Sequence, residues 1–384
     1  MRSSPRVSLG TLAREWFRIG CIGFGGPPTH IALFRRLCVD ERSWLEAKEF
    51  DDTIAATNLL PGPASTQLAI FCAWRLRGIA GAVVGGVCFI APGLALILLL
   101  ADLFLGRHPP DWVLGAAAGG GAAVPAVALH AAWRLTPASW VRIGRRQSEH
   151  IRWLTYGLLS AVAANVIGPY LVLVLLACGL TEVGIRRRAN PGPAFSVIPA
   201  AVLHVASVGG IGALAWVAFK VGALSYGGGF VIIPLMQHDA VATYHWMSSA
   251  QFLTAVTLGQ ITPGPVVQTV AVVGYAAKGI VGGLIAALIA FAPSFVFVIV
   301  GGPHFDQIRA NRAVESFLTG AGPAVIGAIA GSAVLLGRSF QSPWQIGVLA
   351  GALFWMFVFR RGVVTGLLGG AAIGIALALA GVSV

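Results

Sequence analysis

Phe17-Arg18-Ile19-Gly20 and Phe24-Gly25-Gly26 recur 202 positions later as Phe219-Lys220-Val221-Gly222 and Tyr226-Gly227-Gly228. At the same offset, Asn58-Leu59-Leu60-Pro61-Gly62-Pro63 recurs as Gln260-Ile261-Thr262-Pro263-Gly264-Pro265. Further along the chain the offset falls to 201 positions. Gln67, Arg77-Gly78 and Ala91-Pro92 there align with Gln268, Lys278-Gly279 and Ala292-Pro293. A register that drifts by a single residue over this length indicates an internal duplication.

The composition indicates a lipid environment. Hydrophobic residues make up 57% of the 384 residues and charged residues 10%, whereas a soluble domain carries roughly 25% charged residues. The chain also holds 50 glycines and 21 prolines. Membrane helices tolerate them, because small residues allow close packing and neighbouring groups satisfy the freed backbone. Matched breaks in duplicated halves then favour a transport site between the repeats.

The apolar stretches predict an all-α polytopic membrane protein with Gly- and Pro-broken helices. A helix needs about 20 residues to cross a bilayer core of ~30 Å. The clear candidates are 79–105, 112–133, 279–302, 317–337, 343–359 and 363–384. Four further apolar stretches are interrupted by the repeated motifs: 9–26, 53–74, 211–235 and 250–277. The alternation that marks a β-barrel does not persist along the chain.

The charge pattern divides the chain into three predicted segments. These are an N-terminal repeat (1–133), a basic connector with a short helical hairpin (134–195) and a C-terminal repeat (196–384). The net charge is +12, and the basic residues lie mostly between apolar stretches. The positive-inside rule accounts for most of them, so nucleic acid is not an expected partner; attraction of an anionic substrate is a second interpretation. We expect the two repeats to have opposite orientations in the membrane.

Two cations occupy equivalent positions inside apolar stretches, Arg18 and Lys220. A cation inside a membrane helix costs roughly 2.5–3.5 kcal/mol on insertion scales, so one in each half indicates a purpose. Two symmetry-related cations near the repeat interface would suit a divalent anion. The alternative is that each side chain extends to the bilayer surface.

The glycine and proline breaks predict the rest of the substrate site. A helix that restarts after a glycine run points its N–H groups and positive dipole end at the break, where they can bind an anion. A Pro-Gly-Pro break at membrane depth requires protein or a water-filled cavity around it. Amides and hydroxyls beside the breaks can satisfy a dehydrated oxyanion; a structural kink pair is the alternative. The predicted substrate-binding residues, besides the two cations, are Gly25, Gly26, Thr29, Asn58, Pro61, Gly62, Pro63, Gln67, Ser225, Gly227, Gly228, Gly229, Gln260, Thr262, Pro263, Gly264, Pro265 and Gln268.

Other kinds of site lack their sequence signatures. The chain has no nucleophile elbow, no zinc-binding helix motif and no nucleotide-binding loop, so we expect neither enzyme activity nor ATP hydrolysis. Five scattered cysteines lack metal-ligand spacing, and we expect no metal and no cofactor. Carboxylates are sparse in the second half, which argues against a cation transporter. If protons are coupled to transport, Asp52 and Asp239 are the candidate carriers.

These motifs resemble the chromate ion transporter family in its long, two-domain form. The resemblance rests on residues 17–20 with 24–27, on 58–63 through Gln67, and on the counterparts 220–223, 226–230 and 260–265. It covers nearly the whole chain. It implies a multi-pass protein of the bacterial or archaeal inner membrane, in contact with lipid. Such a protein would export chromate with the proton motive force and confer chromate resistance, with sulfate as the expected competitor.

Two other functions stay open at the level of sequence. A transporter of sulfate or another tetrahedral oxyanion, working in uptake or exchange, would use the same site, because chromate and sulfate share charge and shape. A membrane-embedded enzyme acting on an anionic lipid would need a nucleophile or a metal cluster that the sequence does not display. The coupling ion does not follow from the sequence, and a homodimer is compatible with it.

Overall fold

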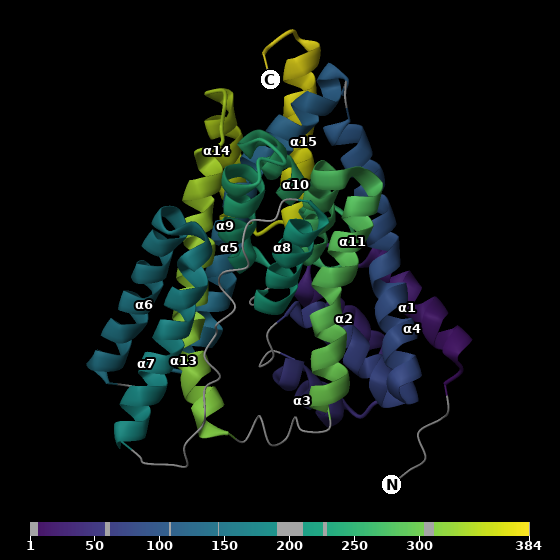
Figure 1. Cartoon of the computed structure of the whole chain (residues 1–384), viewed down its shortest axis with the longest axis vertical. Helices are drawn as coiled ribbons and strands as arrows, with labels where there is room; N and C mark the ends of the chain where they lie inside the picture. The colour runs from purple at the N-terminus through teal and green to yellow at the C-terminus, as the bar shows by residue number, and fades with distance from the viewer. Residues whose placement is uncertain are drawn as a thin grey trace.

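The computed structural model describes residues 7–57, 62–106, 109–144, 146–189, 210–225, 229–302 and 311–383. Within these ranges the protein consists of fourteen α-helices with short 3-10 and π-helical turns, and it has no strand (Figure 1). Four of the helices are long and apolar enough to cross a membrane. The expected all-α polytopic membrane architecture is therefore confirmed.

The helices follow the same order in the two halves of the chain. The first half contains α1 (Leu9–Ile22), α2 (Pro27–Arg35), α3 (Ala47–Thr57), α4 (Ala64–Leu105), α5 (Asp111–Val141), α6 (Gln147–Val166) and α7 (Leu171–Ala189). The second half contains α8 (Ile211–Leu224), α9 (Ile233–Gln237), α10 (Ser249–Ile261), α11 (Thr269–Gly301), α13 (Arg312–Gly337), α14 (Trp344–Phe357) and α15 (Val363–Leu379). The long helices α4, α5, α11 and α13 contain four of the six uninterrupted stretches predicted from hydropathy.

Unusual backbone conformations recur at the offsets of the sequence repeat. A π-helical turn covers Arg36–Glu41 in the first half and His238–Thr243 in the second. Within α4, Gly78 adopts φ 61° and ψ −149°, and within α11 Gly279 adopts φ 64° and ψ −157°. Both glycines bend their helices. Because an L side chain rarely adopts this conformation, glycine is required at both bends.

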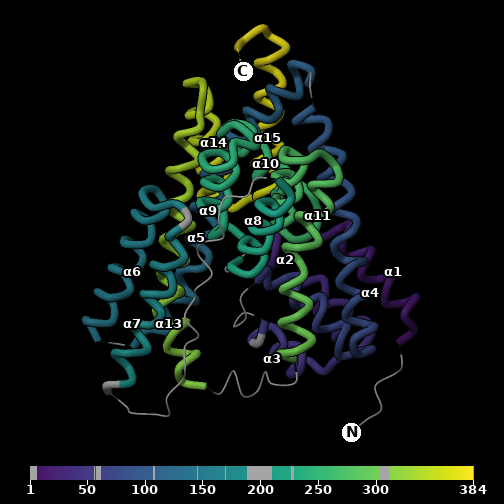
Figure 2. Tube along the Cα trace, in the orientation of Figure 1, coloured from purple at the N-terminus to yellow at the C-terminus, as the bar shows by residue number. Residues whose placement is uncertain are grey.

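Glycines set the closest helix contacts, and these contacts join the two halves. On α5, Gly115 and Gly119 lie against the backbone of Gly374 and Gly370 on α15, four residues apart on each helix. Without side chains at the contact, the two backbones approach as in membrane helix pairs with small residues at this spacing. In the same way α13 packs against α6 and α7, as the green-yellow and teal segments in Figure 2 show.

The predicted connector, residues 134–195, takes part in this packing between the two halves. Its α6–α7 hairpin packs on α13 of the second half, while the α14–α15 hairpin packs on α5 of the first. Helix α5 also continues through residue 133 without a break, so the predicted boundary lies inside a helix.

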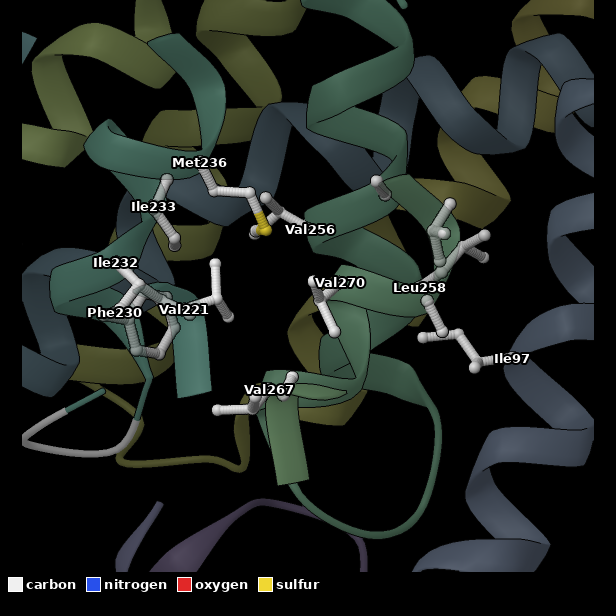
Figure 3. Close-up of a cluster of buried hydrophobic side chains, with 14 of the residues drawn as sticks. Ile97, Val221, Phe230, Ile232, Ile233, Met236, Val256, Leu258, Val267 and Val270 are labelled. Atoms are coloured by element: carbon white, nitrogen blue, oxygen red, sulfur yellow. The ribbon is translucent and has the colours of Figure 1, made fainter. Parts of the chain in front are cut away.

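A buried apolar cluster lies beside the centre of the molecule. Figure 3 shows Val221, Phe230 and Met236 facing Val256 and Val270 across it. All five side chains are at most 5% exposed. They come from the elements between α8 and α11, so the cluster fixes the second-half helices around the repeated breaks.

Candidate functional site

The two Pro-Gly-Pro breaks meet the opposite half of the chain through matched hydrogen bonds. The Gly62 N–H donates to the Ser225 carbonyl oxygen at 2.6 Å, and the Gly264 N–H donates to the Gly23 carbonyl oxygen at 2.9 Å. Gly23 and Ser225 directly follow α1 and α8. Each break is thus closed by the end of the first helix of the other half, which brings the repeated motifs together at one place.

Buried amides fill the space beside the breaks. Gln67 and Ser294 occupy the space that a Cβ at Gly62 would need, and Gln268 does the same at Gly93 of α4. Gln268 Nε2 donates to the Ile90 carbonyl oxygen at 3.0 Å. These glutamines pack between the Pro-Gly-Pro breaks and the long helices. We therefore expect them to stabilise the breaks and not to contact the substrate.

A cavity of about 360 Å³ opens beside the first break. Its lining includes Gly25 and Gly26 before α2, Gly62, and Gln260 near the end of α10. Residues of α5 and α13 contribute much of the remaining lining. A cavity of this size falls in the range of small-ligand sites, and it lies between residues of the two halves.

The start of α2 contributes less hydrogen bonding than a free helix end. Pro27 and Pro28 occupy its first turn, and proline has no N–H. The N–H groups of Thr29 and His30 both donate to the Gly26 carbonyl oxygen, at 3.1 and 3.2 Å. The helix therefore offers the cavity chiefly its dipole, together with backbone at Gly25 and Gly26.

Gln260 is a buried side chain of the cavity lining with an unused donor. It is 7% exposed, and its Nε2 has no hydrogen-bond partner within the described ranges. A buried amide donor without an acceptor costs free energy unless a ligand supplies one. Gln260 is accordingly suited to donate to an anionic oxygen inside the cavity.

The structure places the predicted site residues in three groups. Lining the cavity are Gly25, Gly26, Gly62 and Gln260. Outside its lining are Arg18, Thr29, Pro63, Gln67, Lys220, Ser225, Gly229, Thr262, Pro263, Gly264, Pro265 and Gln268. Asn58, Pro61, Gly227 and Gly228 lie outside the described residues.

The two predicted cations each have a carboxylate neighbour. Arg18 Nε lies 3.0 Å from Glu15 Oε2 on the same helix. Lys220 Nζ lies 2.6 Å from Asp239 Oδ2, and both of these side chains are largely buried. Lys220 therefore ties α8 to the π-helical turn that contains Asp239. A direct role of Arg18 and Lys220 in substrate binding stays a prediction, as does proton transfer by Asp52 and Asp239.

The cavity lining also contains basic side chains that sequence reasoning did not assign to the site. They are His130 and Arg134 of α5, and Arg142, which caps the end of that helix. From the sequence, the positive-inside rule accounted for most basic residues between apolar stretches, the two arginines among them. The missed signal is their spacing: residues 130, 134 and 142 are separated by multiples of four positions, which brings successive members to neighbouring parts of the helix surface.

Comparison with known proteins gives a consistent result. The sequence profile of the chromate transporter family matches residues 10–183 and 212–375. A chromate transport protein of Cupriavidus metallidurans is 31% identical over 88% of this chain and 85% of its own length. A probable chromate transport protein of Synechococcus elongatus is 27% identical over 91% and 97%, respectively. One from Pseudomonas aeruginosa is 28% identical over 87% and 82%. No solved structure matches the chain.

Proposed function

Because the chain belongs to the chromate transporter family, we propose that it is a secondary active transporter that exports chromate across the bacterial inner membrane. The proton motive force drives this export, which confers chromate resistance. The observation that carries the proposal is the cavity between the two halves, where Gln260 presents a buried, unused donor. A dehydrated oxyanion needs such donors for its oxygen atoms.

Alternating access between the two halves supplies the mechanism. The matched helix order and the matched bends support two structural repeats. Their inverted orientation is supported by α7 and α15, which hold the same place in the order and end at opposite ends of the molecule (Figure 1). In transporters built this way, one half moves against the other around a central site.

The distribution of charge supports export as the direction of transport. Helix α6 begins and α7 ends at the bottom of the view in Figure 1. Arg186 and Arg187 lie in the last turn of α7, and Arg142 lies five residues before α6 begins. The positive-inside rule assigns this end to the cytoplasm. The cavity lining reaches Arg142, which supports a cytoplasm-facing conformation of the kind that an exporter needs in order to load its substrate.

Sulfate is the expected competitor, because it presents the same charge and shape as chromate. The cavity displays no feature among its described residues that separates the two ions.

The decisive experiment measures radiolabelled chromate in everted membrane vesicles energised by a proton gradient, with and without excess sulfate. We expect accumulation that collapses with an uncoupler and falls with sulfate. Vesicles without the protein are the control for leakage. Folded protein that gives no accumulation would refute chromate export, and accumulation insensitive to the uncoupler would refute the proton coupling.

A further inference from the structure

We propose that Arg134 and Arg142 of α5, together with the amide of Gln260, form a binding path for a tetrahedral dianion. This inference rests on the transport function proposed above and assigns the charges that receive the substrate. All three side chains line the same cavity. The proposal assigns the receiving charge to these two arginines of the first half instead of the repeated cations of the sequence motif.

The charge of the cavity matches the ligand. Its described lining contains two guanidinium groups and no carboxylate, so the formal charge of +2 balances that of chromate or sulfate. Within the described part of the chain, neither arginine forms an ion pair, whereas Arg152 and Arg186 nearby both bind Glu182. Arg134 and Arg142 thus keep their donors available for an anion.

The spacing of Arg134 and Arg142 along the axis of α5 would let an anion contact them one after the other. The two residues are eight positions apart on one helix face, a rise of about 12 Å. Arg142 is the C-cap of α5, where the partial negative charge of the helix end opposes an approaching anion. The two guanidinium groups offset this charge along the route inward.

Gln260 is the buried member of the path. Its side chain is 93% buried, given an exposed fraction of 7%, and its Nε2 lacks an acceptor among the described residues. The two exposed arginines therefore supply charge, and the buried amide supplies a neutral donor.

The second half does not duplicate the charges. Helix α13, which follows α11 as α5 follows α4, lines the same cavity with Gly322, Val325 and Ile326. The two charges of the path are therefore a feature of the first half alone, and an inverted conformer would present its substrate to a less basic wall. Such a difference favours capture on the Arg142 side and release on the other.

The test compares two tetrahedral ions of different charge. Sulfate is a dianion and perchlorate a monoanion, so their relative inhibition of radiolabelled chromate transport reports on charge recognition. We expect Arg134→Gln and Arg142→Gln each to raise the KM for chromate about tenfold or more. The preference for sulfate over perchlorate should fall by a similar factor, and Arg134→Lys should retain part of it.

The matched control is Arg338→Gln. Arg338 is the exposed C-cap of α13, as Arg142 is of α5, but it does not line the cavity. Its substitution should leave the KM for chromate and the preference for sulfate over perchlorate unchanged. Equal loss of inhibition by sulfate and perchlorate in the Arg134 and Arg142 variants would overturn the proposal, as would an unchanged KM.

Equilibrium binding of radiolabelled sulfate to the purified protein separates this inference from the transport proposal. If the wild type binds sulfate but does not move chromate, the proposed function fails while the binding path is still tested. Weaker sulfate binding by Arg134→Gln, with Arg338→Gln unaffected, then supports the path. Equal binding by all three proteins refutes it.

Discussion

The amide of Gln260 illustrates how a single buried group can reveal a ligand. Its Nε2 has no partner among the described residues, so the folded protein gains no hydrogen bond from that donor. Gln260→Leu should leave the thermal unfolding midpoint unchanged or slightly raised. A hydrogen bond to a charged group contributes about 1.5–3 kcal/mol, so the KM for chromate should rise about ten- to a hundredfold.

Gln260→Glu is the paired variant, with nearly the same shape and a negative charge. It should abolish transport, because it places a carboxylate in a cavity that receives an anion. A large drop in thermal stability of Gln260→Leu would show instead that the amide holds the fold together.

Lys220 and Asp239 form a buried pair, and Lys220 Nζ also lies 5.7 Å from the ring centroid of Trp216. Removing one partner leaves the other charge uncompensated, at a cost of about 3–5 kcal/mol. Lys220→Met should therefore lower the unfolding midpoint in detergent, and the double variant Lys220→Met/Asp239→Leu should recover much of the loss. A double variant as unstable as the single one would contradict this structural role.

Sequence reasoning at the residue scale found part of the cavity wall. The repeat pointed to Gly25, Gly26, Gly62 and Gln260, which line it, because a ligand site between repeats tends to involve the matched breaks. It passed over Arg134, because membrane orientation already explained basic residues between apolar stretches. Only the folded helix shows which face those cations occupy.

The bends of α4 and α11 depend on glycine for their backbone conformation. A Cβ added at Gly78 or Gly279 meets nothing within 4 Å, so space is not the constraint. At φ 61° and 64°, however, alanine is strained by about 1–3 kcal/mol. Gly78→Ala and Gly279→Ala should each lower the unfolding midpoint, and the double variant should lower it further.

Gly347→Ala in α14 is the matched control for these bends. It too has open space at Cβ, but it lies within a regular helix, where alanine is more favourable than glycine by roughly 0.5–1 kcal/mol. It should be neutral or stabilising. Equal effects of Gly78→Ala and Gly347→Ala would show that the bend is not a property of the native backbone.

Hydropathy predicted the helices well where an apolar stretch was long and uninterrupted. Each of the six uninterrupted apolar stretches coincides with part of a helix. The π-helical turns at Arg36–Glu41 and His238–Thr243 could not be foreseen, because no residue preference distinguishes them from α-helix. The extent of α5 beyond residue 133 was also missed, since its polar end was read as the start of a connector.

The cavity should be accessible from one side of the membrane. Ala138 lines it and is exposed. A cysteine there, with Cys21 and Cys88 replaced by alanine, should react with a membrane-impermeant thiol reagent in everted vesicles and be protected by sulfate. The other three cysteines are buried.

A cysteine at Ala380 provides the comparison. Ala380 follows α15, which ends with the C-terminus at the opposite end of the molecule (Figure 1). It should react in right-side-out preparations and be indifferent to sulfate. Reaction of both cysteines from the same side would contradict the proposed orientation.

Hydrogen bonds and helical hairpins that link the two halves make each half depend on the other for folding. Gly62 and Gly264 donate hydrogen bonds to Ser225 and Gly23 of the opposite half. Helices α5 and α13 each pack against a hairpin from the other half. Fragments 1–199 and 200–384, made separately, should each be degraded, whereas their co-expression should restore transport. The protein is in this sense an obligate heterodimer whose two subunits share one peptide backbone.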